Sequence, residues 1–404
     1  MLALTIFLLT YVGVALGRVP GLVLDRTGIA LLGAIGMVVG GVISLDQAIT
    51  GIDFPTIVLL YALMILSAQL RLGGFYTRTA SRIALLFDRP RLFLFVCMVT
   101  SALLSAVLAN DIVCLAFTPV ITVALVKSDK NPLPFLIGLA VSSNIGSAAT
   151  IIGNPQNMLI GQVGRFPFGA FLAWCGPPAV LALVGSYLII CVSYRNGFCT
   201  PQAVSRAGMR ENWPEFNLWQ STKGLLVAGI LVFLFFTSIP RELSAIAMAG
   251  VLLCSRKMKT HSMIKLVDWH LIILFCALFV VIKGISEENL PAIIMEFLNQ
   301  RGIDLRNPLI LTGVSTVTSN LVSNVPATML LIRFLDPANP IEWYTLAVSS
   351  TFAGNLILIG SIANLIVIEQ AKQYGVEITF REHARVGIPV TVFSLLVLMG
   401  WIYL

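Results

Sequence analysis

Long apolar runs alternate with short polar segments along almost the whole chain. Most of the runs approach or exceed the roughly 20 residues that cross a bilayer as a helix. Only 11% of the 404 residues are charged, whereas a water-soluble domain carries about 25%. This pattern predicts an all-α polytopic membrane protein. The apolar runs are residues 2–17, 27–43, 54–70, 92–126, 134–160, 168–193, 224–237, 243–254, 269–282, 308–332, 343–367 and 386–404.

The distribution of basic residues orients these runs. When loops are assigned to alternate sides, most of the 26 Lys and Arg fall on one side, and the positive-inside rule makes that side the cytoplasm. The basic loops all fall on the cytoplasmic side only if 92–126 and 308–332 are re-entrant hairpins, each of which enters and leaves the membrane on one side. This topology puts both termini outside. Run 2–17 has neither a basic start nor a cleavage site, so we expect a first helix rather than a signal peptide. The basic residues left outside are Arg165, Arg241, Lys283, Arg301, Arg306 and Arg333.

An internal repeat supports this topology. Asp-Phe at 53–54 recurs as Asp-Trp at 268–269, and Ala-Val-Ser-Ser at 140–143 recurs at 347–350. The hairpin tips 109–111 and 323–325 align between these matches. Apolar residues match easily by chance, but polar matches in a fixed order favour a true repeat.

Two halves follow from the repeat, each with about five crossings and one re-entrant hairpin. An odd number of crossings inverts the second half relative to the first. Inverted repeats with broken helices near the midplane are the architecture of secondary transporters. The expected parts are a first repeat at 1–197 (hairpin 92–126, broken helix 134–160), a cytoplasmic linker at 198–221, and a second repeat at 222–404 (hairpin 308–332, broken helix 343–367).

Four polar segments interrupt the apolar runs at positions that predict the transport site. They are the two hairpin tips and the segments 144–157 and 353–364. Non-helical backbone survives at membrane depth only when it is buried in protein or lines a wet cavity. Glycines there serve packing as often as binding, whereas an unpaired amide is costly. The candidate substrate-binding residues are Asn110, Asn144, Gly153, Asn154, Asn157, Ser323, Asn324, Thr328, Asn355, Ser361 and Asn364.

Asp111 is the one acidic residue well inside an apolar segment. An intramembrane carboxylate is a functional candidate by default, so we expect it to couple transport to protons or sodium ions. The alternative is a hairpin-tip acid that caps backbone N–H groups. Asp46, Asp53, Asp268, Glu287 and Glu288 fall at expected helix ends, where carboxylates are ordinary.

These motifs resemble those of the ion transporter superfamily, in particular its arsenite-pump and sodium/proton-antiporter branch. The matching segments are Ala-Asn-Asp at 109–111, Gly-Asn-Pro-Gln-Asn at 153–157 and Ser-Asn-Val-Pro-Ala-Thr at 323–328. The resemblance implies a scaffold and a mobile transport domain, elevator-like motion and a homodimer, and it raises a soluble ATPase subunit as a candidate partner. Divalent-anion members carry Ser-Asn-Thr in both hairpins; this chain departs from that pattern, which argues against di- and tricarboxylates.

The absence of basic residues from the four breaks limits the kinds of substrate that they could bind. None contains Lys or Arg, so a neutral polyol such as arsenous acid, As(OH)3, fits better than a multiply charged anion. We therefore expect proton-coupled efflux of arsenite and antimonite from the inner membrane of a bacterium or archaeon. A sodium/proton antiporter or an anion permease of the same fold is the alternative, and a channel or membrane scaffold is a third. We expect neither enzymatic activity nor a cofactor, metal or nucleic-acid partner; the interacting species are a small inorganic or anionic substrate, the coupling ion and lipid.

Overall fold

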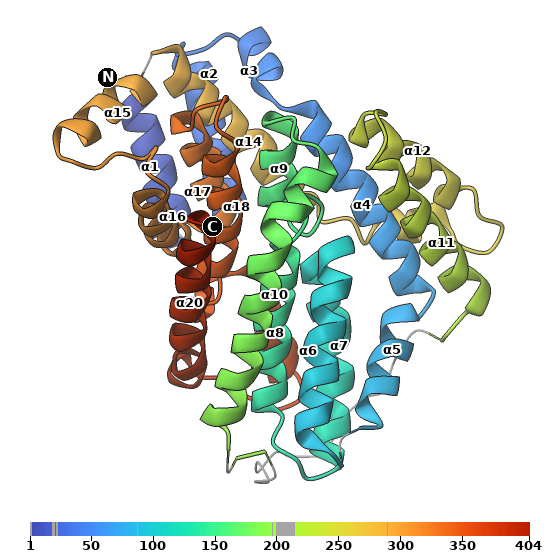
Figure 1. Ribbon diagram of the computed structural model, residues 1–404. Coiled ribbons are helices and arrows are strands. Elements are labelled where there is room, and N and C mark those ends of the chain that lie inside the picture. The colour runs from blue at the N-terminus through green and yellow to red at the C-terminus, as the bar shows by residue number, and fades with distance from the viewer. Residues whose placement is uncertain are drawn as a thin grey trace.

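The computed structural model describes residues 2–17, 21, 23–86, 88–195, 197–198, 215–288 and 290–404. Most of the predicted linker at 198–221 therefore lies outside the described residues. Within the described ranges every regular element is a helix, as the apolar pattern predicts. Figure 1 shows both termini in its upper half and the C-terminal end of α10 at the bottom.

Ten helices occupy the first half of the described chain, and three of them, α3, α5 and α9, are short. The ten are α1 (Leu2–Leu16), α2 (Arg26–Val39), α3 (Leu45–Gly51), α4 (Phe54–Leu72), α5 (Phe75–Ala84), α6 (Pro90–Val107), α7 (Asn110–Lys127), α8 (Leu133–Ser147), α9 (Pro155–Val163) and α10 (Phe168–Ser193).

The same order of long and short helices recurs in the second half. These are α11 (Leu218–Leu234), α12 (Arg241–Leu253), α13 (Thr260–Ile264), α14 (Trp269–Glu287), α15 (Leu290–Gln300), α16 (Pro308–Val322), α17 (Asn324–Leu331), α18 (Pro340–Ala353), α19 (Ile362–Lys372) and α20 (Phe380–Ile402), with 3-10 turns η1 (Ile332–Phe334) and η2 (Leu358–Gly360). The repeat of elements supports the repeat in sequence. The inversion of one half relative to the other stays a prediction.

Helices exchange partners between the halves. The second helix of each half, α2 or α12, packs along the fourth helix of the other half, α14 or α4 respectively. In Figure 1, α11 and α12 accordingly lie beside α4 at the right, and α1, α2 and α14 form a group at the left. The last helices of the two halves, α10 and α20, pack on each other.

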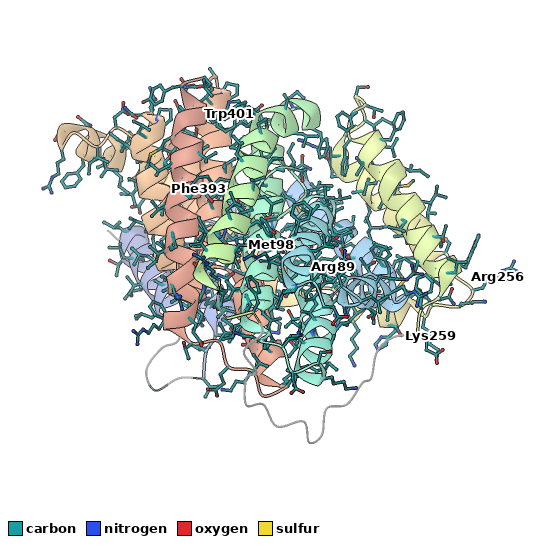
Figure 2. The ribbon with its side chains drawn as sticks, turned by 60° about the horizontal axis from the view of Figure 1, so that its bottom comes forward. Arg89, Met98, Arg256, Lys259, Phe393 and Trp401 are labelled. Atoms are coloured by element: carbon teal, nitrogen blue, oxygen red, sulfur yellow. The ribbon has the colours of Figure 1, made fainter. Side chains whose placement is uncertain are left out.

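Among the described residues, six helices are long and apolar enough to cross a membrane: α4, α6, α7, α10, α14 and α20. Side chains cover the whole bundle, and Arg256 and Lys259 project away from it beyond α12 (Figure 2). Helices α6 and α7 have 18 residues each, about 27 Å at 1.5 Å per residue. The arms of the second hairpin, α16 and α17, have 15 and 8, so the two hairpins differ in depth.

Each predicted hairpin turns at its polar tip. The first helix pair breaks at residues 108–109, between α6 and α7, and the second at Ser323, between α16 and α17. In each half, one pair of serines joins the first arm of the hairpin to the helix after the hairpin. Ser105 Oγ lies 2.9 Å from Ser143 Oγ of α8, and Ser315 Oγ lies 2.6 Å from Ser349 Oγ of α18. That each hairpin enters and leaves the membrane on the same side stays a prediction.

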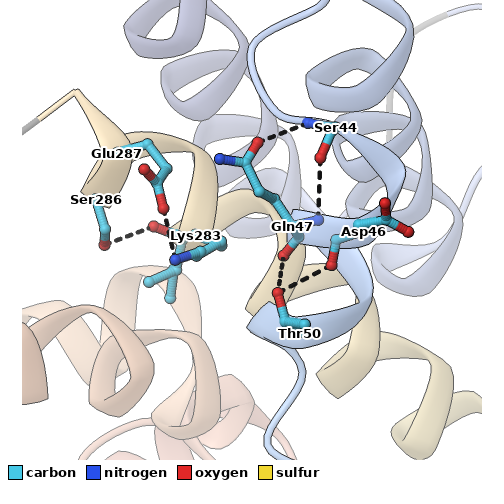
Figure 3. A network of polar contacts seen from close by, with 8 residues as sticks. Ser44, Asp46, Gln47, Thr50, Lys283, Ser286 and Glu287 are labelled. Carbon is cyan, nitrogen blue, oxygen red and sulfur yellow. Dashed lines mark hydrogen bonds and ion pairs between the residues drawn. The ribbon is translucent and has the colours of Figure 1, made fainter.

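Polar caps begin the helices at the ends of the bundle. Ser44 and Gln47 form a capping box on α3, next to the end of α14, where Lys283 pairs with Glu287 (Figure 3). Asp53 accepts the N–H of Thr56 at the start of α4. A cap satisfies one of the N–H groups that a helix start leaves unpaired, so Asp53 has the ordinary role at a helix end that the sequence predicts.

Candidate functional site

A network of side-chain amides surrounds Asn144 of α8. Its Oδ1 accepts hydrogen bonds from Asn110 Nδ2 at 3.3 Å and from Ser361 Oγ at 2.9 Å. Its Nδ2 donates to the Oδ1 of Asn355 at 2.9 Å and to that of Asn364 at 3.2 Å. The buried amide of Asn144 therefore joins the tip of the first hairpin to the break between α18 and α19. Its partners in that break, Asn355 and Asn364, lie 211 and 220 positions from Asn144 in sequence.

The break between α8 and α9 is closed by Asn154 and Gly153. Asn154 caps α9 by accepting the N–H of Asn157 at 2.9 Å, and its Nδ2 donates to Ser147 Oγ at 3.0 Å and to Thr351 Oγ1 at 3.2 Å. A Cβ on Gly153 would lie 2.2 Å from the carbonyl oxygen of Ser147. Gly153 thus permits a close turn, and Asn154 ties that turn to the other half.

The tip of the second hairpin faces the other break. Ser323 has φ of 76°, a left-handed conformation that costs a non-glycine residue about 1–3 kcal/mol and clusters at functional sites. In the orientation that satisfies both ends of its amide, Asn324 donates to Ser350 O at 3.2 Å and to Gly360 O at 3.3 Å. Thr328, one helical turn on, is fully buried.

Several buried polar atoms in these segments have no hydrogen-bond partner among the described residues. They include Asn110 Oδ1, Asn355 Nδ2, Asn157 Oδ1 and Thr328 Oγ1. Buried polar atoms are normally paired, so each unpaired one calls for an explanation. Because both donors and acceptors are unpaired, a small hydroxylated ligand would match them better than an ion of either sign.

His383 of α20 also belongs to this region, although the sequence motifs do not single it out. It is 3% exposed, and its Nε2 lies 3.4 Å from Asn364 Nδ2. The Asn364 amide already donates to the carbonyls of Gly354 and Ile357, so an NH2 group can face Nε2 only if that nitrogen is unprotonated. The proton of the neutral ring then sits on Nδ1, which is buried without a described partner.

Asp111 points away from the amide network although it follows Asn110 directly. Its side chain lines a separate cavity of about 120 Å³ between α4, α7 and the start of α14. Arg71 and Asp268 are the other charged residues of the lining. Sequence reasoning had no signal for this grouping, because Arg71 and Asp268 both read as helix-end residues.

Within the described ranges, no three His, Cys, Asp or Glu side chains come together as a group that could hold a metal ion. Cys114, one turn beyond Asp111, is a buried free thiol. The amide network itself consists of uncharged side chains, Asn and Ser. Its chemistry is therefore hydrogen bonding without a fixed charge.

Known proteins resemble the chain over nearly its full length. The family described as citrate transporter matches residues 11–353. A 46 kDa membrane protein of Mycobacterium leprae (strain TN) is 29% identical, with 98% of this chain and 96% of that protein aligned. A silicon efflux transporter of Oryza sativa subsp. japonica is also 29% identical, with coverages of 92% and 91%.

The fold has a counterpart in a solved structure. The crystal structure of the YdaH transporter of Alcanivorax borkumensis superposes with a TM-score of 0.58 over 99% of this chain and 96% of that one, at 14% sequence identity. At such low identity the likeness concerns the fold alone.

Proposed function

The chain belongs to the citrate transporter family of the ion transporter superfamily and is a multi-pass secondary transporter, and from this we propose that it exports arsenite and antimonite in exchange for protons. The observation that carries the proposal is the uncharged amide network around Asn144, which unites residues of both halves. Inverted repeats place transport sites at such a junction.

A neutral substrate fits the chemistry of this network. Arsenous acid is uncharged at neutral pH and presents hydroxyl groups that both donate and accept hydrogen bonds. The unpaired atoms Asn110 Oδ1 and Asn355 Nδ2 supply one acceptor and one donor. The relative named for silicon efflux points to the same class, because dissolved silicon is the neutral hydroxide Si(OH)4.

Citrate is the competing substrate, since it gives the family its description. Three negative charges require compensation when they leave water, and Lys and Arg are absent from all four breaks. The absence of basic residues disfavours citrate as the substrate, so an organic-anion permease is the second candidate and not the first. Uptake of labelled citrate that As(III) does not inhibit would favour the permease over the exporter.

Asp111 is the coupling residue of the proposed exchange. A carboxyl group at the tip of the first hairpin can carry a proton one way while the substrate moves the other way. Alternating access would be an elevator-like movement of the hairpins and broken helices against the scaffold, as a homodimer. Such exchange works if the protonated Asp111 and the loaded site favour opposite facing states.

Inverted membrane vesicles test the function directly. Wild-type protein should accumulate As(III) when the vesicle interior is acidified, and should protect a pump-deficient host from arsenite. Asp111→Asn should still exchange As(III) between equal pools but should lose accumulation driven by the pH gradient. Full accumulation by Asp111→Asn would refute the coupling role, because Asn caps a helix nearly as well as Asp.

A further inference from the structure

We propose that Arg71, Asp111 and Asp268 form a proton-exchange site in their own cavity, apart from the amide network, and that this site holds one proton. This inference rests on the proposed proton-coupled transport, and it places the site of the proton apart from the site of the substrate. It also gives roles to two residues, Arg71 and Asp268, that the substrate site does not use.

The cavity brings the two halves of the chain together. Arg71 lies near the end of α4 and Asp111 on the first turn of α7, whereas Asp268 immediately precedes α14 of the second half. The volume of about 120 Å³ is large enough to hold water beside the carboxylates. Water in the cavity can pass a proton between the two carboxyl groups, apart from the substrate network.

The charges of the lining favour a single bound proton. With both carboxylates ionised, the cavity carries one net negative charge, and one proton neutralises it against Arg71. The rest of the lining is apolar, including Leu60, Leu63 and Met64 of α4. An unbalanced charge is expensive in such surroundings, so the neutral, singly protonated state is the stable one.

Hydrogen bonding decides which carboxyl group takes the proton. Asp268 caps α14 by accepting the N–H of Leu271 at 2.9 Å, so this carboxylate already has a hydrogen-bond donor at the helix start. Asp111 accepts no hydrogen bond from any described residue, although its helix starts beside it. We therefore place the proton on Asp111, and Asp268 stays ionised in the same cavity as Arg71.

Among the residues that the structure describes, no other charged or titratable group lines the cavity. Helices α9 and α19 supply only Pro155, Met158 and Ile366, and none of the described residues of α5, α6 or α8 lines it. The thiol of Cys114 lies on α7 itself and is buried. Arg71 also makes the wall unsuited to a metal cation, because its fixed positive charge repels one, whereas a proton on Asp111 creates no such repulsion.

Comparison of the two halves distinguishes the helix cap Asp268, which has a counterpart in the other half, from Arg71 and Asp111, which have none. Helices α4 and α14 have 19 residues each, and their caps Asp53 and Asp268 are equivalent. At the position equivalent to Arg71 the second half has Ser286, and at that of Asp111 it has Val325. The capping aspartates are thus common to both halves, and the Arg71–Asp111 pair is an addition to one.

The titration of Asp111 in purified protein tests the site without relying on transport. The infrared C=O band of its protonated carboxyl group, identified as the band that Asp111→Asn lacks, gives the midpoint pH. Arg71→Gln removes the counter-charge and should raise the midpoint by about one pH unit or more; Asp268→Asn removes the competing anion and should lower it. Asn also caps helices, so Asp268→Asn keeps the start of α14.

Asp53→Asn is the matched control, because it changes the equivalent cap away from the cavity. It should leave the midpoint within a few tenths of a pH unit. Shifts of equal size and sign in Asp53→Asn and Asp268→Asn, or no shift in Arg71→Gln, would overturn the proton site. Absence of As(III) exchange by wild-type protein, with the three midpoints as expected, would instead refute the proposed substrate and leave the proton site standing.

Discussion

Asn157 and Asn364, 207 positions apart, make the same two contacts. Each directs its Nδ2 to the carbonyl oxygens of the residues ten and seven positions before it: Ser147 and Thr150 at 3.2 and 3.0 Å, and Gly354 and Ile357 at 2.8 and 3.3 Å. These amides satisfy backbone carbonyls that the broken helices leave free. Both residues therefore hold the shape of a break, whatever else they bind.

Replacing either asparagine should destabilise the fold. Asn157→Ala and Asn364→Ala each leave two or more buried carbonyls unpaired, at about 1–3 kcal/mol each. We expect a lower midpoint of thermal unfolding in detergent and a lower folded yield for both variants. A midpoint equal to that of the wild type in either variant would show that the carbonyls find water or other partners.

Asn110 and Asn355 should behave differently, because each has an unpaired amide atom beside Asn144. Asn110→Ala and Asn355→Ala remove one protein hydrogen bond each and a potential substrate contact. We expect unfolding midpoints close to the wild type and a tenfold or greater rise in the KM for As(III), equivalent to about 1.4 kcal/mol. An unchanged KM in both would place the substrate elsewhere.

Gly153→Ala should disrupt the first break. The added Cβ would meet the carbonyl oxygen of Ser147 at 2.2 Å, whereas a Cβ on Gly229 of α11 meets no atom within 4 Å. We expect Gly153→Ala to lose transport and folded yield, and Gly229→Ala to keep both. The comparison controls for the general effect of a glycine-to-alanine change in this protein.

The orientation of the chain can be tested by cysteine labelling in intact cells. In a background with exposed Cys254 replaced by serine, a cysteine at Ser238, between α11 and α12, should react with an impermeant reagent from outside. A cysteine at Ser205, which lies outside the described residues, should react only after the cells are opened. Labelling of position 205 in intact cells would contradict the cytoplasmic linker and the outer termini.

The long helices were predictable because a bilayer requires apolar runs of a fixed length. The short helices α5 and α15 were not, since both are amphipathic and lie in segments that read as loops. Within the site, the asparagines were predictable because amides are rare at membrane depth. Their pairing around Asn144 was not, nor was the burial of His383, because both depend on side chains some 200 or more positions away.

The same dependence on distance explains what the sequence could not indicate about Asp111. Its neighbour Asn110 joins the amide network, but Asp111 faces Arg71 and Asp268. Successive residues at a helix start point in directions about 100° apart. Only the packing of α4 and α14 against that start decides which surroundings each side chain receives.

Because α2 packs on α14 of the other half, α2 is synthesised well before the helix that covers it. About 230 residues separate the end of α2 from the start of its partner α14, which at roughly 5–20 residues per second is tens of seconds of translation. During that interval the face of α2 that α14 will cover must be shielded by lipid or by the insertion machinery. The nascent first half is therefore a long-lived, incompletely packed species, and slowing of the ribosome between codons 40 and 268 should increase its exposure to membrane proteases.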